Sequence, residues 1–133
     1  LPELESSRRR NFEKLTNIFE KYQDFFVLPR PTEKSDPCWF GFMPLIKDNK
    51  YFNRNHFTSY LEINKIQTRP YFTGNLLYHP AYKRLNNKYN IAEFPNANVA
   101  TRNSIMLGTY IGITDTKIKK IEGVVEQFFK EVL

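Results

Sequence analysis

Apolar residues recur at helical spacing near both ends of the chain. Over residues 4–23 they return every three or four positions while Arg and Glu fill the places between, which predicts an amphipathic helix. A second helix is predicted after Thr114, because threonine is a residue type that caps helices. The apolar stripe of that helix consists of Ile118, Ile121, Val124, Val125, Phe128 and Val132. Each stripe needs an apolar partner, so we expect both helices to pack against a sheet.

The segments between these helices contain two candidate strands. Residues 38–47 are apolar on both alternating sets, as in a strand covered on both faces, and Pro44 places that strand at an edge or at a bulge. Residues 66–72 carry β-branched and aromatic side chains and are followed by turn residues at 73–75. Residues 107–113 are expected to form a strand or an extended loop.

Two shorter helices are also predicted. Asn53 is a suitable N-cap for a helix over residues 54–65. The inner face of that helix consists of Phe57, Tyr60 and Leu61. Residues 96–106 form the other helix, after a loop-like stretch with a short turn at 80–85. We therefore expect a single α+β domain in which helices pack against a small sheet.

The chain is basic, and the placement of its charge bears on its partners. Its 133 residues include 20 Lys and Arg against 14 Asp and Glu, a formal net charge of +6. The dense clusters, at residues 8–10 and 117–120, lie among Glu residues on predicted helices. Phosphate-backbone binding needs several cations on one face, so we expect no nucleic-acid partner. A basic module that binds nucleic acid or protein is the alternative, and its nucleic-acid binding should weaken steeply with salt.

Composition sets further limits. Aromatic residues make up 16% of the chain, more than a small core usually needs, so some rings are expected at an interface or a ligand cleft. No apolar run approaches the roughly 20 residues that cross a bilayer, and we expect no membrane partner. The single cysteine, Cys38, allows no internal disulfide, which fits a cytoplasmic protein. The chain begins at Leu1 without a methionine or a signal pattern, and we expect a fragment of a longer protein.

Residue types that carry catalysis are scattered. His56 falls on the polar side of its predicted helix and is expected to be solvated. His79 lies in a loop with no carboxylate near it in sequence to orient the ring, so we expect a structural or solvated role. Cys38, beside Trp39, is expected to be a small core residue and not a nucleophile, since apolar neighbours raise the pKa of a buried thiol. The residues therefore predict no catalytic constellation and no metal site.

The segment from Thr68 to Leu76 differs from the rest of the chain. It places a guanidinium, an amide, hydroxyls and two rings within nine residues at a strand end, where loops can reach a ligand. The planar donor fork of Arg69 suits a phosphate or a sugar oxygen. Alternatively, Arg69 forms a surface ion pair and the rings belong to the core. The predicted substrate-binding residues are Thr68, Arg69, Tyr71, Phe72, Gly74 and Asn75.

Several motifs together resemble a known family. They are SDPCWFGF at 35–42, NKIQTR at 64–69, FTGNL at 72–76, PAY at 80–82 and IGIT at 111–114. Over nearly the whole chain they resemble the C-terminal small domain of the nucleotide-sugar aminotransferase-like family of vitamin B6 enzymes. Within this family, the motif Thr-Arg-x-x-Phe-x-Gly-Asn-Leu at 68–76 is similar to the corresponding motif of one branch, the CDP-4-keto-6-deoxyglucose 3-dehydratases. Cys38 and His79 depart from the pattern, which has Ser and Gln at those positions.

The resemblance implies the small domain of the aspartate-aminotransferase type, a mostly antiparallel sheet with helices on one side. It also implies a pyridoxal or pyridoxamine phosphate cofactor (PLP or PMP) that is anchored by a Lys or His in a large domain outside this chain. This chain by itself would then be inactive. The cofactor would act as an electron sink while the sugar loses its C3 hydroxyl in lipopolysaccharide and deoxysugar biosynthesis. Arg69 and Asn75 would hold the substrate, and Tyr71 or Phe72 would exclude water.

The resemblance implies partners as well. They are the missing large domain, a second copy in a homodimer and a nucleotide-sugar substrate. A sugar aminotransferase of the same fold is the alternative enzyme, and the residue at the cofactor anchor, His or Lys, would distinguish the two.

Overall fold

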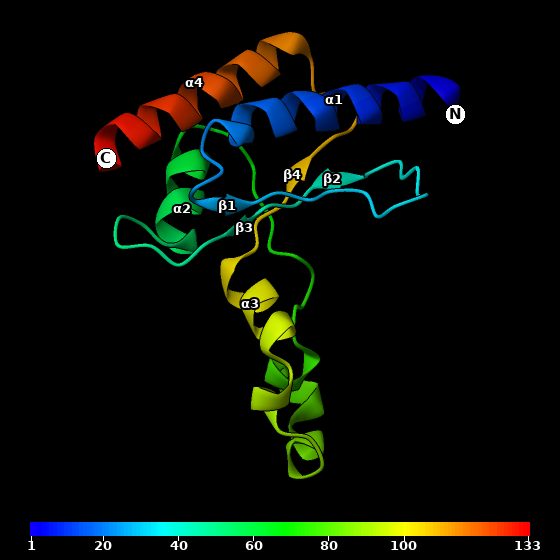
Figure 1. The fold of residues 1–133 in the computed structure, drawn as a ribbon, viewed down its shortest axis with the longest axis vertical. Coiled ribbons are helices and arrows are strands. Elements are labelled where there is room, and N and C mark those ends of the chain that lie inside the picture. Colours follow the sequence, from blue (N-terminus) through cyan, green and yellow to red (C-terminus); the bar gives the residue numbers. More distant parts are fainter.

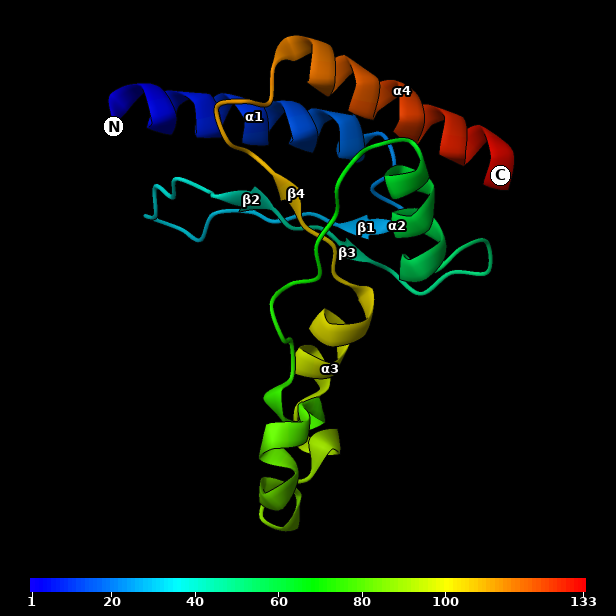
Figure 2. The same cartoon turned by 180° about the vertical axis from the view of Figure 1, so that it is seen from behind.

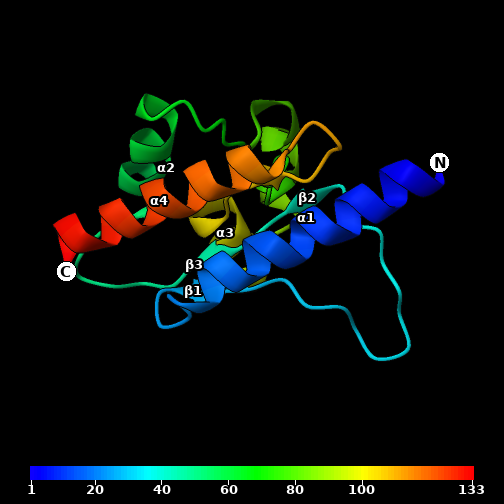
Figure 3. The ribbon, with the colours of Figure 1, turned by 90° about the horizontal axis from the view of Figure 1, so that it is seen from above.

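The computed structural model describes the backbone of residues 1–133 and the side chains of residues 1–84 and 88–133. Figure 1 shows a body of helices and short strands from which a narrow arm projects. Two long helices, α1 (Pro2–Glu20) and α4 (Asp115–Val132), lie side by side at the top of the body (Figure 3). Both predicted terminal helices are confirmed, and α1 ends three residues before the predicted position 23.

Ion pairs show that α1 and α4 run in the same direction. Lys14 Nζ lies 2.7 Å from Asp115 Oδ1. Seven residues further along both helices, Lys21 Nζ lies 2.7 Å from Glu122 Oε1. The predicted cap of α4 is confirmed, because Thr114 accepts a hydrogen bond from a backbone N–H in the first turn of the helix.

The predicted strand at 38–47 forms two short strands that pair on opposite edges. Strand β2 (Gly41–Phe42) pairs antiparallel with β4 (Leu107–Gly108), and β3 (Leu45–Ile46) pairs antiparallel with β1 (Phe26–Val27). The sequence predicts an edge or a bulge at Pro44, and the structure has a break between β2 and β3 there. The Pro44 carbonyl accepts from Ile105 N–H at 3.2 Å. Pairing with the segment that contains Ile105 and β4 therefore continues past the proline in the same register.

The predicted strand at 66–72 is reduced to a single bridge, so that prediction was wrong in extent. Arg69 and Met106 exchange two backbone hydrogen bonds, of 3.0 and 2.7 Å, at the outer edge of the sheet. Pairing ends there because Pro70 has no N–H to donate and Phe72 has a left-handed φ of +46°. Likewise, only Leu107–Gly108 of the predicted stretch 107–113 forms a strand.

The core lies between the helices and the strands. Its most deeply buried side chains are Leu15, Phe19, Phe42, Phe57, Leu61, Ile105, Val125 and Phe128. Many of the rings meet edge to face, as Phe57 and Phe128 do with centroids 4.9 Å apart. Helix α2 (Arg54–Ile63) contributes two of these residues, and its predicted N-cap is confirmed, since Asn53 accepts from His56 N–H at 3.0 Å. The predicted α+β class with antiparallel pairing is confirmed.

The arm contains the remaining helices. Three short 3₁₀ helices, Leu76–Tyr78, Pro80–Asn87 and Ile91–Glu93, precede α3 (Pro95–Asn103). Figure 2 shows that α3 lies on the side of the strands away from α1 and α4, so it does not share their layer. The sequence predicts a helix over residues 96–106, which the structure has at Pro95–Asn103, and predicts a loop with one short turn for residues 76–95, where the structure has three 3₁₀ helices.

The prediction that Cys38 is a core residue was wrong, because its side chain is exposed. It lies in the loop before β2. The next residue, Trp39, packs on the protein in its place: its ring stacks on Phe12 with centroids 5.1 Å apart and planes 9° apart. Among the described residues, no helix has the length and apolar character to span a membrane.

Candidate functional site

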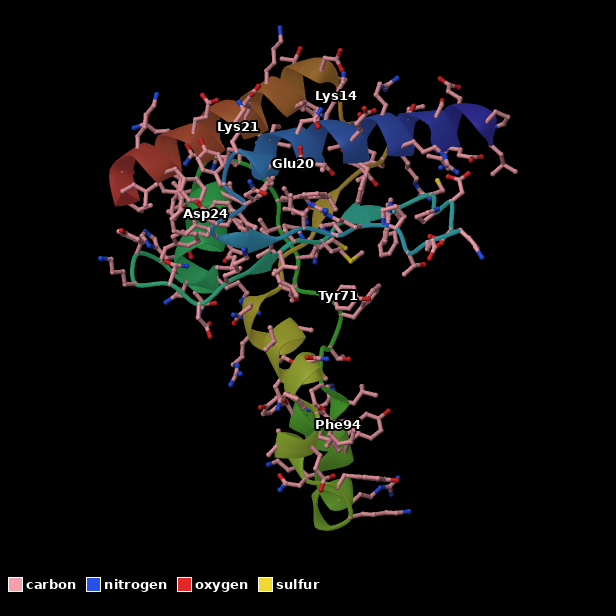
Figure 4. The ribbon with its side chains drawn as sticks, in the orientation of Figure 1. Lys14, Glu20, Lys21, Asp24, Tyr71 and Phe94 are labelled. Carbon is pink, nitrogen blue, oxygen red and sulfur yellow. The ribbon has the colours of Figure 1, made fainter. Side chains whose placement is uncertain are left out.

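The segment from Thr68 to Leu76 leads from the edge of the sheet into the arm. Backbone pairing with Met106 holds Arg69 at that edge, and its side chain is exposed. Tyr71 and Phe72 follow with exposed fractions of 41% and 67%. Figure 4 shows Tyr71 at the root of the arm and Phe94 further along it, both toward the same side. The predicted site segment therefore lies on the surface of the junction.

Tyr71, Phe72 and Phe40 form an exposed aromatic patch. The rings of Phe40 and Phe72 have centroids 6.0 Å apart, and those of Tyr71 and Phe72 are 5.4 Å apart. Phe40 comes from the loop before β2, so two distant segments contribute to the patch. The alternative that Tyr71 and Phe72 belong to the core is wrong, because both rings remain accessible.

Arg69 forms no ion pair among the described side chains. With its amide oxygen turned toward the guanidinium, Gln67 accepts from Arg69 at 2.7 Å. A neutral amide leaves the positive charge of Arg69 in place. Its remaining donors can therefore reach an oxygen of a phosphate or a sugar.

Arg69 also lines a polar hollow of about 180 Å³ between α2 and the sheet edge. Its polar lining consists of Arg54, Asn55, Thr58, Glu62, Thr68, Arg69 and Ser104. Thr68 is 8% exposed and donates its hydroxyl proton to Glu62 Oε1 at 2.6 Å. Arg54 donates to the Thr101 carbonyl at 2.9 Å, which ties α2 to α3.

Sequence reasoning missed the contribution of α2 to this hollow. Arg54, Thr58 and Glu62 follow one another at four-residue spacing, which puts them on one face of the helix. That spacing was the available signal. Two guanidinium groups and one carboxylate leave the hollow with a surplus of positive charge, which suits an anionic or hydroxyl-rich ligand.

Gly74 and Asn75 form a tight turn against α3. Gly74 has a φ of +59°, a conformation that glycine adopts without steric cost. Asn75 is 6% exposed, and its side chain donates to Asn98 Oδ1 at 2.7 Å and accepts from Leu77 N–H at 3.0 Å. The Asn75 side chain thus faces the arm in this structure and holds the turn in place.

The other sequence candidates lie apart from this site. His56 is exposed on α2, as expected, with its ring at the edge of Phe128. His79 is exposed, and its Nδ1 accepts from Ala81 N–H at 3.3 Å, which is a local structural role. Within the described part of the chain, no three His, Cys, Asp or Glu residues are grouped to hold a metal ion.

An apolar hollow of about 330 Å³ lies in the arm next to the turn. It is lined by Leu76, Leu77, Tyr82, Tyr89 and Phe94, together with the Gly74–Asn75 turn and Ala97. Rings that stay exposed on a projecting arm are typical of surfaces that another polypeptide covers.

Two curated proteins are similar to this chain. It is 34% identical over 128 residues to the lipopolysaccharide biosynthesis protein RfbH of Salmonella typhimurium, covering 96% of this chain and 29% of that protein. It is 35% identical over 124 residues to the dTDP-4-dehydro-2,6-dideoxy-D-glucose 3-dehydratase of Saccharopolyspora spinosa, covering 92% of this chain and 26% of that protein. The chain thus spans less than a third of the length of either relative.

A solved structure and a family model agree with these relatives. The GDP-4-keto-6-deoxy-D-mannose-3-dehydratase of E. coli, solved with bound hydrated PLP, superposes with a TM-score of 0.74 at 23% identity, over 92% of this chain and 31% of that one. The model of the DegT/DnrJ/EryC1/StrS aminotransferase family matches residues 1–126. This chain therefore belongs to the DegT/DnrJ/EryC1/StrS aminotransferase family.

Proposed function

We propose that residues 1–133 are the C-terminal small domain of a PLP- or PMP-dependent nucleotide-sugar 3-dehydratase, with the large domain outside this chain. The parent would act in lipopolysaccharide or other deoxysugar biosynthesis. The observation that carries the proposal is the position of Arg69, locked by its backbone to the sheet edge between a polar hollow and an aromatic patch. Both curated relatives support it, one a 3-dehydratase and the other a lipopolysaccharide biosynthesis protein.

In this proposal the chain positions the substrate. Arg69 donates to a sugar or phosphate oxygen through its planar guanidinium fork. Tyr71 and Phe72 cover the bound sugar and exclude water from it. The resemblance implies that Asn75 also holds the substrate, but its side chain is bonded to Asn98 and to Leu77 N–H. We therefore propose that Asn75, with Thr68 and Gly74, shapes the segment 68–76 through intramolecular bonds and the tight turn.

The residues of this chain do not fit the role of cofactor anchor. A Schiff-base lysine needs a desolvated setting that lowers the pKa of its ammonium group. The side chain of Lys14, at 34% exposed, is the least accessible lysine among the described residues and is paired with Asp115. We therefore propose that the anchor lies outside this chain.

The exposed rings of the arm and the aromatic patch suggest where the rest of the enzyme packs. We propose that the large domain, or the second subunit of a homodimer, covers the side of the arm that carries Tyr71 and Phe94. Association would remove these rings from water, which is favourable in proportion to the apolar area buried. The proposed location of the parent is the cytoplasm.

Arg69→Ala in the full-length parent tests the function. Loss of a charge-assisted contact to the substrate should lower kcat/KM at least about tenfold, equivalent to about 1.4 kcal/mol. Arg30→Ala is the matched control, because Arg30 is exposed in the loop after β1, remote in sequence from the site segment. Unchanged kinetics in Arg69→Ala, with the fold intact by circular dichroism, would reject the role.

A nucleotide-sugar aminotransferase is the second candidate, since the matching family model is named for aminotransferases. The two reactions give different products. A dehydratase removes the C3 hydroxyl of the sugar, whereas an aminotransferase transfers nitrogen from an amino donor. Mass spectrometry of the product formed by the parent with and without glutamate would separate them.

A further inference from the structure

A further hollow, of about 310 Å³, lies between the end of α2, strand β4 and the first turns of α4. Its floor is part of the core: Ile66, Leu107 and Ile121 are at most 7% exposed. The volume lies at the lower end of the range of small-molecule pockets, about 300–1,000 Å³. The floor can therefore accept an apolar group of modest size.

Three lysines surround this floor. Lys65 follows α2, while Lys117 and Lys120 are three residues apart on α4 and so project from the same face of the helix. Lys117 Nζ donates to the Gly112 carbonyl at 2.8 Å, which places its ammonium group at the rim. We name this feature the lysine hollow, defined by these three lysines and its apolar floor.

Among the described residues, no carboxylate lines the lysine hollow. Three acidic groups on the helices that border the hollow have other partners. Asp115 pairs with Lys14, Glu122 pairs with Lys21, and Glu62 accepts from Thr68. The positive charge of the three lysines is therefore not balanced within the hollow.

Lys65 has an unfavourable backbone conformation. Its φ is +64°, in the left-handed region that favours glycine, at the position directly after the cap of α2. Lys65 N–H donates to the Glu62 carbonyl and Ile66 N–H donates to the Leu61 carbonyl, both at 2.9 Å. This is a helix C-terminus at which glycine is the usual residue. A lysine there carries strain, and strained residues concentrate at functional sites.

Tyr110 provides an aromatic wall. It lines the lysine hollow, and its side chain is 50% exposed. The ring packs over Gly112, where an added Cβ would lie 2.3 Å from ring carbon Cε2. Because the ring is held against its own chain, it offers a pre-positioned surface beside the three ammonium groups.

We propose that the lysine hollow binds a small aryl phosphate, an aromatic ring whose oxygen is esterified directly to a phosphate group. The aromatic group lies on the apolar floor against Tyr110, and the phosphate meets Lys65, Lys117 and Lys120. Apolar contact and charge are both needed, because exposed lysines alone bind phosphate weakly and are screened by salt. This site does not depend on the function proposed for Arg69.

Binding of 1-naphthyl phosphate, followed by its fluorescence, tests the proposal, with 1-naphthol and inorganic phosphate as separate probes. We expect naphthyl phosphate to bind more tightly than either and to weaken as salt increases. The variant K117Q/K120Q should bind about tenfold more weakly. K119Q/K130Q is the matched control, because it removes the same charge from α4 at positions outside the hollow, and it should bind as the native protein does.

Lys65→Gly provides a variant that favours folding. Glycine relieves the left-handed strain, so the thermal midpoint should not fall while binding weakens. Arg69→Ala should leave naphthyl phosphate binding unchanged, which separates this site from the proposed substrate segment. Equal losses in K117Q/K120Q and K119Q/K130Q, or naphthyl phosphate binding no tighter than inorganic phosphate, would overturn the proposal.

Discussion

Gly74 lies directly against Thr101: a Cβ built on Gly74 would be 2.2 Å from Thr101 Oγ1. The same hydroxyl accepts from Asn75 N–H at 2.7 Å and donates to the Ala97 carbonyl at 2.7 Å. One threonine of α3 and one glycine of the segment 68–76 therefore pack against each other at the root of the arm. No larger residue at position 74 leaves this arrangement undisturbed.

Gly74→Ala should destabilise the arm by about 1–3 kcal/mol, through the left-handed φ and the clash with Thr101. Hydrogen exchange of the arm amides and thermal unfolding measure the effect. Gly123→Ala is the control, since a Cβ there meets nothing within 4 Å on α4. It should stabilise the protein by about 0.5–1 kcal/mol. A neutral Gly74→Ala would contradict the tight packing.

Asn75 and Asn98 should behave as one unit. Each is at most 8% exposed, and their amides share a hydrogen bond of 2.7 Å. Alanine at either position leaves a buried polar group without its partner, at a cost of about 1–3 kcal/mol. The double variant should cost less than the two single costs added together. Additive effects in a double-mutant cycle by urea unfolding would show that the two side chains do not cooperate.

Phe72 has a left-handed φ of +46° although its ring is 67% exposed. Burial does not compensate such strain, so we expect the ring to be retained for its contact with a ligand or another domain. Phe72→Gly should leave the free energy of unfolding unchanged or raise it by up to about 1 kcal/mol. In the parent, the same change should lower activity.

Tyr71→Gly is the matched control for that prediction, because its φ is not in the left-handed region. Glycine there only adds freedom to the unfolded chain and should cost about 0.5–1 kcal/mol. Urea unfolding of the two variants side by side gives the comparison. Equal destabilisation by both changes would mean that Phe72 carries no strain.

The pair between Lys14 and Asp115 should make stability depend on pH at acid values. The hydrogen bond from Lys14, together with its charge, lowers the pKa of Asp115 below its ordinary 3.8. A lowered carboxyl pKa stabilises the fold above the ordinary value, and this contribution disappears as the pH falls through the folded value. Since Asp115 is exposed, the effect should be small and sensitive to salt.

Asp115→Asn should therefore lower the thermal midpoint at about pH 6 and leave it unchanged near about pH 2. Asp24→Asn is a suitable control, because Asp24 is exposed and in no ion pair of the described residues. Thermal unfolding of both variants at the two pH values gives the comparison. A midpoint shift in Asp115→Asn that persists at about pH 2 would assign the effect to something other than ionisation.

The sequence by itself determined the helices of the body and their caps. The periodicity of residues 4–23, the cap at Asn53 and the cap at Thr114 each depend on residues within about one helical turn. Pro44 likewise indicated an irregular position in its strand, an edge or a bulge, since its missing N–H is a local property. The motif at 68–76 indicated the family and the candidate segment.

Only the tertiary structure decided which groups meet. Arg69 takes the sheet edge because Met106, distant in sequence, offers both of its backbone groups there. Asn98 turns the Asn75 side chain toward the arm, and Cys38 is exposed because Trp39 occupies the neighbouring apolar surface. Local patterns follow from the geometry of one helix or strand. Long-range pairing depends on which separate segments bring unsatisfied hydrogen-bonding groups and apolar surface to the same place.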